Sequence, residues 1–295
     1  MDKLICVVGT NASGKSGLGV TLAERFNGEI ISADSRQVYR GLDLGSGKIT
    51  PEETRGVPHH LLDVRDVNEF FSMHDFQELA YAAIEDILSR GKLPFIVGGT
   101  GLYVDSVADG YVLSGGAPDL EYRDFLETKT TEELRAMLDE ACPGHGIDPR
   151  NRNRLMRRLE RLHAGDDITP KAEKRYDVLR LGVTWDRKTL CDRIDERLKR
   201  RMEQGMVDEV RELLEQGATP LFLDKLGLEY RYIYRYISGE ISTEEEMLDE
   251  LSRAIKRFAK RQMTWFRKNK DTVWLDMEND PVKQASEAIE KFLAG

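Results

Sequence analysis

The chain has 295 residues, of which 40% are hydrophobic and 33% are charged. This composition is typical of a folded globular protein and excludes a disordered or collagen-like chain. The sequence has no apolar run of membrane-spanning length, and its N-terminus leads into a glycine-rich loop rather than a signal-peptide cleavage site. We therefore expect a cytoplasmic protein with no membrane segment. The three cysteines are far apart and lack metal-binding spacing, so neither a disulfide framework nor a zinc site is expected.

The charge is unevenly distributed along the chain. With 44 Lys and Arg against 53 Asp and Glu, the net charge is −9, which argues against indiscriminate binding to nucleic acids. Residues 150–161 nevertheless contain six arginines and one acid, and residues 253–270 contain eight basic residues and no acid. One such run is usually a solvated helix face. Two in an acidic chain favour contacts with an anionic partner, and we expect them to flank the opening of the active site.

The first third of the chain alternates between strand and helix patterns. Residues 4–9 form a short apolar run, followed by a glycine-rich loop and a helical pattern with Leu18, Leu22 and Phe26 on one side. Further strands are predicted at 29–34, 59–64 and 94–98, with a helix whose N-cap is Ser72 and whose capping-box acid is Asp75. This alternation predicts an α/β fold, a P-loop NTPase-like parallel sheet with helices on both faces. Segments 9–16, 34–37 and 98–103 would meet at the carboxyl ends of its strands, where ligands bind.

The pattern becomes helical from about residue 114. A linker at 114–119 precedes helical segments at 121–140 and 151–164, and a strand returns at 176–185. We therefore expect an α/β catalytic core at 1–113 and 176–295, interrupted by a small all-helical insertion domain at 114–175. The remaining elements expected in the core are helices at 187–215, 229–237 and 243–268 and a strand at 273–277.

The most informative motif is GTNASGKS, which matches the P-loop pattern GxxxxGK[ST] between a strand and a helix. Backbone N–H groups of such a loop bind phosphate oxygens, the lysine adds a positive charge, and the last hydroxyl can bind Mg²⁺. The sequence thus predicts a phosphate-containing ligand for Gly9, Thr10, Asn11, Ala12, Ser13, Gly14, Lys15 and Ser16.

The role of Asp34 is left open by the residues alone. A nucleotide-hydrolysing enzyme needs a second apolar strand that ends in a metal-binding Asp. The strand at 94–98 ends in Gly98-Gly99-Thr100 instead. Asp34 ends another strand, where it could bind a metal, act as a general base, or only cap a turn.

Several motifs together resemble the tRNA dimethylallyltransferase (tRNA isopentenyltransferase) family. They are GTNASGKS, DSRQVYRGLDLGSGK, GVPHHLLD, FSMHDFQ, FIVGGTGLY, GLEYR and AKRQMTWFRK, in this order. The resemblance covers nearly the whole chain. The chain departs from the family pattern at Asn11, at Ser46-Gly47, where threonine-alanine is more common, and in its short insertion.

The resemblance implies transfer of a dimethylallyl group from dimethylallyl diphosphate to the exocyclic N6 amine of the adenosine 3′-adjacent to the anticodon in tRNA. The P-loop would then hold the diphosphate leaving group, with Mg²⁺ near Ser16. Asp34 would be the general base, and Thr100 and Arg197 would bind the diphosphate and stabilise its developing charge. Without the resemblance, Thr100 would be interpreted as a turn hydroxyl and Arg197 as an exposed helical charge.

The resemblance also implies contacts with the anticodon stem-loop of tRNA, whose target base must leave its stack. The residues implied are Asp34, Ser35, Arg36, Gln37, Arg123, Asn153, Arg154, Leu155, Met156, Arg157, Gly227, Tyr230 and Arg231. Simpler interpretations are ion pairs of Arg154 and Arg157 with Glu160 or Glu121, and a core position for Tyr230.

We expect a monomer whose partners are tRNA and dimethylallyl diphosphate. The alternative functions are an adenylate dimethylallyltransferase acting on free nucleotide, a P-loop kinase of a small metabolite, and a non-enzymatic RNA-binding protein. A kinase would have no use for the basic helices, and the free-nucleotide enzyme would not need the helical insertion. A binding protein would not need Asp34 and Thr100 together.

Overall fold

The computed structural model describes residues 1–113, 119–165 and 172–295, which form two compact units. The larger unit comprises Met1–Gly110 and Lys174–Gly295, and the smaller comprises Tyr111–Glu173. The linker expected at 114–119 falls almost entirely outside the described residues. Within the described ranges, no helix combines the length and apolar character needed to cross a membrane.

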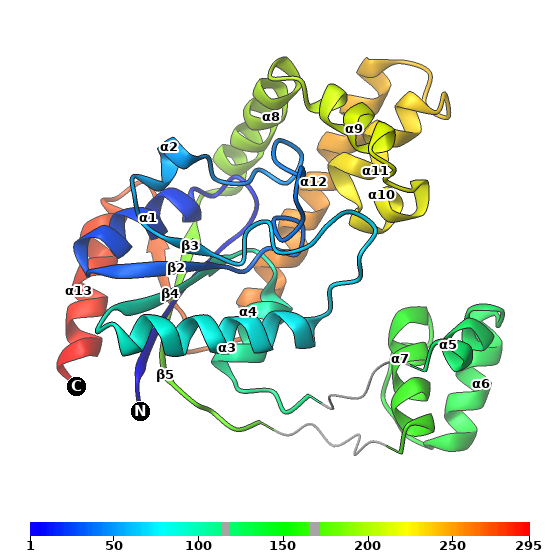
Figure 1. Ribbon diagram of the computed structural model, residues 1–295, viewed down its shortest axis with the longest axis horizontal. Coiled ribbons are helices and arrows are strands. Elements are labelled where there is room, and N and C mark those ends of the chain that lie inside the picture. Colours follow the sequence, from blue (N-terminus) through cyan, green and yellow to red (C-terminus); the bar gives the residue numbers. More distant parts are fainter. Residues whose placement is uncertain (114–118, 166–171) are drawn as a thin grey trace. The chain divides into compact units, whose positions relative to one another are not determined.

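The larger unit is built on a six-stranded sheet with the strand order β3-β2-β4-β1-β5-β6 (Figure 1). Every pairing between these strands is parallel, which confirms the expected α/β class. The strands are β1 (Lys3–Val8), β2 (Gly28–Ser32), β3 (His59–His60), β4 (Leu93–Gly98), β5 (Asp177–Thr184) and β6 (Val273–Asp276). The strand expected at 59–64 is thus only two residues long. Since β2 and β4 lie on one side of β1 and β5 and β6 on the other, the carboxyl end of β1 is the switch point where such sheets bind ligands.

Helices cover both faces of this sheet, as Figure 1 shows. Helices α1 (Lys15–Arg25) and α13 (Pro281–Ala294) share one hydrophobic core with Ile5 and Val7 of β1. Helices α3 (Met73–Ser89), α4 (Gly101–Ala108) and α12 (Glu244–Phe266) contribute to the other core, which contains Leu4 and Cys6. The continuous apolar run of β1 is explained by this burial on both faces.

Local signals fix several helix ends. The Ser72 hydroxyl accepts a hydrogen bond from the Asp75 N–H, and the Asp75 carboxylate accepts one from the Ser72 N–H, so the predicted capping box is present. The helix expected at 187–215 is instead two helices, α8 (Arg187–Glu203) and α9 (Met206–Glu215). Gly205 separates them because its φ of 96° is left-handed, which favours glycine. The remaining helices of this unit are α2 (Pro51–Thr54), α10 (Pro220–Leu226) and α11 (Leu228–Ile237).

The smaller unit contains three described helices, α5 (Leu120–Glu127), α6 (Thr131–Ala141) and α7 (Arg152–His163). The predicted helical stretch at 121–140 breaks at Thr130, whose hydroxyl accepts a hydrogen bond from the Glu133 N–H as the N-cap of α6. This unit has its own apolar core, formed by Leu126, Leu134, Leu138, Leu155, Met156 and Leu159.

Candidate active site

The P-loop connects β1 to α1 and forms a concave turn of backbone. Ala12 and Gly14 have φ values of 60° and 85°, and left-handed residues of this kind turn successive N–H groups to one side. The Ser13 hydroxyl donates a 2.8 Å hydrogen bond to the Thr10 carbonyl, which closes the turn from within. Helix α1 has no side-chain hydrogen bond at its N-cap, so its first N–H groups face the loop without a protein cap. This arrangement is suited to bind an anion.

Lys15 and Asp34 place opposite charges beside this loop. The Lys15 ammonium donates a 3.2 Å hydrogen bond to the Thr10 carbonyl. Burial lowers the pKa of Lys15, the Asp34 carboxylate opposes that shift, and the cations of Arg36 and Arg201 add to it. A lysine surrounded by other cations favours binding of an additional anion, because the anion relieves their repulsion.

Asp34 and Thr100 lie at adjacent strand ends that are directly bonded to each other. The Thr100 N–H donates a 3.1 Å hydrogen bond to the Ala33 carbonyl, and the Thr100 hydroxyl accepts a 3.1 Å bond from the Ser35 N–H. This close approach requires Gly98, because a Cβ there would overlap the Ala33 carbonyl. The sequence places both residues at strand ends, and the structure brings them together.

Asp34 also forms the turn that was its simplest interpretation. Its Oδ1 accepts a 3.0 Å hydrogen bond from the Arg36 N–H, which is an Asx turn. In the described part of the chain its Oδ2 accepts no hydrogen bond. The turn fixes the orientation of the carboxylate and leaves one oxygen available for a proton or a cation.

Helix α12 joins the P-loop to the turn that carries Thr100. The Gln262 side chain accepts a 3.0 Å hydrogen bond from the Asn11 N–H and donates a 2.9 Å bond to the Gly99 carbonyl. One turn later, Trp265 packs where a Cβ on Gly101 would overlap its indole, and it donates a 2.7 Å hydrogen bond to Asp105. Sequence reasoning gave neither Gln262 nor Trp265 a role, although both lie within the quoted motif AKRQMTWFRK.

Helix α8 contributes arginines from the other side of the loop. Arg193 donates a 3.0 Å hydrogen bond to the Ala12 carbonyl and stacks on Trp185, whose indole N–H bonds the Ser13 carbonyl at 2.9 Å. Arg197, the predicted residue, lies one turn further and lines a narrow pocket with Asn11 and Ala12. Arg193 was missed, although its spacing of four residues from Arg197 puts both on one face of a helix.

A buried carboxylate organises the predicted RNA-binding segment at 34–37. Glu229 and Arg36 form a 2.5 Å ion pair, and both residues are buried. Glu229 also faces Arg201 at 3.8 Å. The Arg36 guanidinium is therefore held by Glu229, while the Gln37 side chain bonds the Ser32 hydroxyl and the Gly47 carbonyl.

Tyr230 occupies a core position in this structure. It is fully buried, its hydroxyl donates a 3.1 Å hydrogen bond to Glu209, and its ring lies 2.7 Å from where a Cβ on Gly45 would be. The Glu209 carboxylate also accepts hydrogen bonds from the N–H groups of Asp43, Leu44 and Gly45. Tyr230 thus stabilises the loop after the 34–37 segment, and its ring exposes no face on which a base could stack.

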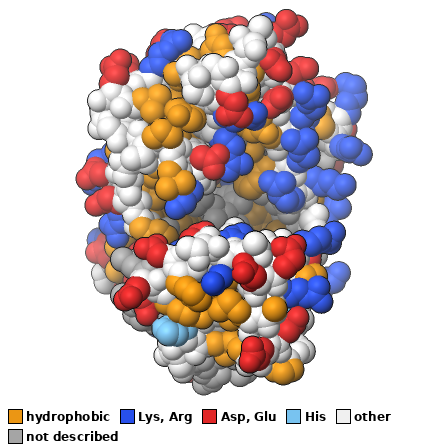
Figure 2. Space-filling view, turned by 90° about the vertical axis from the view of Figure 1, so that its right-hand side faces the viewer, with side chains coloured by type: hydrophobic (Ala, Val, Ile, Leu, Met, Phe, Trp, Pro, Cys, Tyr) orange, Lys and Arg blue, Asp and Glu red, His pale blue; other side chains and the backbone are white. Residues whose placement is uncertain are grey.

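The other predicted RNA contacts in the larger unit are at the surface. Gly227 precedes α11 with a φ of 71°, and Arg231 forms a 2.7 Å ion pair with Asp224. Helix α12 and its C-terminal extension expose a basic face made of Arg253, Arg257, Lys260, Arg261, Arg267, Lys268 and Lys270. Figure 2 shows Lys and Arg side chains gathered on one side of the larger unit.

In the smaller unit the predicted segment 153–157 divides into a core half and an exposed half. The side chains of Leu155 and Met156 belong to the apolar core of this unit. Asn153 and Arg154 are exposed, while Arg157 pairs with Glu160 at 3.2 Å. Arg123 faces the same Glu160 at 3.7 Å. The ion pair expected as the simpler interpretation of Arg157 is therefore present.

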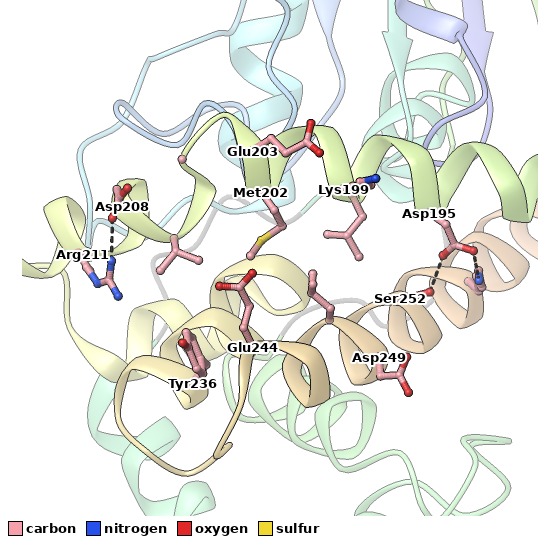
Figure 3. A pocket seen from close by; sticks show the side chains of 15 residues that line it. Asp195, Lys199, Met202, Glu203, Asp208, Arg211, Tyr236, Glu244, Asp249 and Ser252 are labelled. Carbon is pink, nitrogen blue, oxygen red and sulfur yellow. Dashed lines mark hydrogen bonds and ion pairs between the residues drawn. The ribbon is translucent and has the colours of Figure 1, made fainter.

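Two larger cavities lie in the larger unit. One of about 390 Å³ begins beside Asp34, at Ser35 and Arg36, and is lined by the rings of Tyr39, Phe70, Phe71, Tyr103 and Phe222. The other, of about 800 Å³, lies between α8, α9 and α12 (Figure 3). Its charged groups are partly paired, since Asp195 contacts Ser252 and Lys256, each at 2.6 Å. It contains none of the predicted site residues, whereas the first cavity is lined by Ser35 and Arg36 of the predicted RNA-binding segment.

The sequence matches a known protein family and curated relatives over most of its length. A family model described as IPP transferase matches residues 37–269. A tRNA dimethylallyltransferase of Halalkalibacterium halodurans is 40% identical, with 100% of this chain and 97% of that protein covered. A tRNA dimethylallyltransferase 2 of Citrifermentans bemidjiense is 44% identical, with 99% and 96% covered.

Solved structures of tRNA prenyltransferases have the same fold as this chain. A crystal structure of the tRNA isopentenylpyrophosphate transferase of Bacillus halodurans superposes with a TM-score of 0.76 at 37% identity, covering 100% of this chain and 99% of that one. A structure of a eukaryotic dimethylallyltransferase acting on tRNA gives a TM-score of 0.85 at 26% identity, covering 100% of this chain and 80% of that one. The strand order, the P-loop and these matches over the full length agree, and the chain belongs to the IPP transferase family.

Proposed function

We propose that this protein transfers the dimethylallyl group of dimethylallyl diphosphate to the N6 amine of the adenosine 3′-adjacent to the anticodon in tRNA. The observation that carries the proposal is a set of hydrogen bonds: Ser35 to Thr100 brings the Asp34 and Thr100 strand ends together, and Gln262 joins the Thr100 turn to the P-loop. An adenine amine is a weak nucleophile, so transfer needs a base for its proton and stabilisation of the leaving diphosphate.

In the proposed reaction, the N6–C1 bond to the dimethylallyl group forms while the C1–O bond to the diphosphate breaks. The N6 proton passes to Asp34, whose Oδ2 accepts no hydrogen bond from the described residues. The leaving diphosphate takes the electron pair of the broken bond. Charge stabilisation at the diphosphate is greatest when its donors are held rigid before reaction.

The P-loop is the proposed diphosphate site. Its N–H groups, Lys15 and Arg197 would bind the phosphate oxygens. The Thr100 hydroxyl already accepts a hydrogen bond from Ser35, and no described residue accepts its hydrogen. It can therefore donate that hydrogen to an oxygen of the diphosphate.

Mg²⁺ is the proposed metal, with Ser16 as its protein ligand. Ser16 is exposed at the start of α1, and the described residues contain no group of three His, Cys, Asp or Glu side chains that could hold a metal. A single hydroxyl beside a phosphate-binding loop fits Mg²⁺, because this ion is commonly bound by few protein ligands together with substrate phosphates and water. When bound, Mg²⁺ neutralises charge on the diphosphate.

We further propose that the cavity beginning at Ser35 and Arg36 receives the unstacked adenine, because its lining includes the exposed ring of Phe70 and aromatic rings are suited to stack on a base. The basic face of α12 and the exposed Asn153, Arg154 and Arg157 would hold the RNA, with the helical insertion at 114–175 as a tRNA-binding domain and Arg123, Gly227 and Arg231 as further contacts. We also propose that the enzyme is a monomer and acts in the cytoplasm.

Mass spectrometry tests the proposal directly. The protein is incubated with dimethylallyl diphosphate and Mg²⁺, together with either tRNA or AMP. We expect tRNA to gain the mass of one five-carbon unit at the adenosine beside the anticodon, and AMP to remain unmodified. Modification of AMP alone would identify an adenylate dimethylallyltransferase instead.

A further inference from the structure

Two arginines one turn apart on α8 reach the same point near the P-loop. Arg197 and Arg201 line the narrow pocket that also contains Asn11 and Ala12. The space for their guanidinium groups is provided by Gly47, because a Cβ there would overlap the Nη2 atoms of both. A residue with any side chain at position 47 would therefore displace these groups.

Arg201 lacks a carboxylate of its own. Its side chain is 12% exposed, and the carboxylate it faces, Glu229, lies 3.8 Å away, beyond hydrogen-bond distance. Glu229 already pairs with Arg36 at 2.5 Å. Among the described residues Arg201 makes no hydrogen bond, and burial lowers its pKa. A buried cation that shares one carboxylate with another cation leaves a positive charge without a full counter-charge.

The positive charge of Arg201 acts on two groups of the proposed site, Lys15 and Asp34. Arg201 lowers the pKa of Lys15, and Asp34 is among the anions that raise the pKa of Arg201. The Arg201 guanidinium is thus within electrostatic range of both groups, and its field adds to that of the P-loop. Helix α8 supplies this charge from outside the P-loop motif.

The pocket is too small for a whole ligand. Its volume is about 20 Å³, roughly the space of one water molecule. A phosphoryl group could direct one oxygen into it and receive hydrogen bonds from both guanidinium groups. Arginine is well suited to this because its planar donors match two phosphate oxygens.

We infer that Arg201, in the space left by Gly47, binds an oxygen of a phosphoryl group together with Arg197. This inference rests on the proposed function, since the phosphoryl group belongs either to the diphosphate of the prenyl donor or to the RNA backbone next to the target base. The two sources share one chemistry and can be separated by measuring the two ligands independently.

The test compares Arg201→Met with a matched control on the same helix. Arg200 is exposed and pairs with Glu196, so Arg200→Met removes a charge one residue away without touching the pocket. Affinity for inorganic diphosphate is measured by titration calorimetry, and affinity for tRNA by filter binding at several salt concentrations. Thermal unfolding verifies the fold. Should Arg201→Met not fold, Arg201→Gln takes its place, because it is also neutral and its polar amide is less costly to place beside the charged groups of Glu229 and Arg36.

We expect Arg201→Met to weaken diphosphate binding by about 10- to 100-fold, the loss typical of a hydrogen bond to a charged group, with Arg200→Met unchanged. A loss confined to tRNA, with a salt slope reduced by roughly one, would assign the phosphoryl group to the RNA. A folded neutral variant that binds both ligands as the wild type does would overturn the inference and leave Arg201 as a partner of Glu229. If the wild type prenylates tRNA in that case, the proposed function stands. A wild type that binds neither ligand would overturn both.

Discussion

The Gln262 side-chain oxygen accepts a 3.0 Å hydrogen bond from the backbone N–H of Asn11, although 251 residues separate the two in the chain. The same amide donates to the Gly99 carbonyl at 2.9 Å. Gln262 thus fixes the distance between the P-loop and the turn that carries Thr100. This buried side chain adds a direct link between the two halves of the proposed site, which follow the paired strands β1 and β4.

Replacement of Gln262 by Ala should therefore reduce both stability and turnover. It leaves the Asn11 N–H and the Gly99 carbonyl without their partner, which costs about 1–3 kcal/mol for each buried group that stays unsatisfied. We expect kcat to fall more than tenfold and the unfolding midpoint in urea to decrease. Thr264→Ala, on the exposed side of the same helix, is the control. Wild-type kcat in Gln262→Ala would show that the link has no part in alignment.

Asp34→Asn separates a general base from a metal ligand. Asparagine keeps an oxygen for the hydrogen bond from the Arg36 N–H and loses the capacity to take a proton. We expect the rate of the chemical step, measured in single turnover, to fall by about 10²- to 10⁴-fold. The affinity for diphosphate and the Mg²⁺ dependence should remain. Their disappearance would instead assign Asp34 to the metal.

Much of this site follows from local sequence signals. The P-loop spacing, the capping box at Ser72 and Asp75 and the polar residues that end β2 and β4 are each encoded within a few residues, and the structure contains each of them. A parallel sheet then brings the strand ends together, so Asp34 and Thr100 could be expected as neighbours.

The contacts that link distant segments could not be predicted in this way. Glu229, Glu209 and Gln262 are charged or polar residues within helices, where a solvated surface is the usual interpretation. Only tertiary packing brings them into contact with Arg36, Tyr230 and the P-loop. The break of the helix at 187–215 did have a local signal, Gly205, which helical periodicity on both sides obscured.

The pH dependence of stability should depend strongly on Glu29. Its buried carboxylate accepts hydrogen bonds from Arg90 and from Lys92 at 2.7 Å, and His60 lies 2.8 Å away. The hydrogen bond from Arg90 is the largest cause that holds the pKa of Glu29 well below its ordinary value of 4.5. A lowered native pKa gives stability that is present above pH 4.5 and is lost progressively as the pH falls below it.

We therefore expect Glu29→Gln to destabilise the protein by roughly 1–3 kcal/mol at pH 7 and to reduce the loss of stability between about pH 5 and pH 3. Urea unfolding at a series of pH values measures both effects. Asp86→Asn, which affects the exposed partner of Arg90 only, is the control. Parallel stability curves for the wild type and Glu29→Gln would contradict the assignment.

Removal of two charges from α7 tests the role of the helical insertion. Arg154 is exposed, and Arg157 has only a surface pair with Glu160, so the double change to Gln should alter stability by less than about 1 kcal/mol. We expect weaker tRNA binding with a salt slope reduced by roughly one for each lost phosphate contact. Arg135→Gln on α6, an exposed residue paired with Asp139, serves as the control. Unchanged tRNA affinity and salt slope would identify the arginine-rich segment 150–161 as a solvated helix face.

The most direct test of the central claim is a site-resolved mass measurement on tRNA after incubation with dimethylallyl diphosphate and Mg²⁺. The wild type should add one five-carbon unit to the adenosine 3′-adjacent to the anticodon, and Lys15→Ala and Asp34→Asn should lose this product while remaining folded. The claim would be contradicted if the wild-type protein left the tRNA unmodified and hydrolysed ATP without tRNA. The P-loop would then be assigned to a nucleotide.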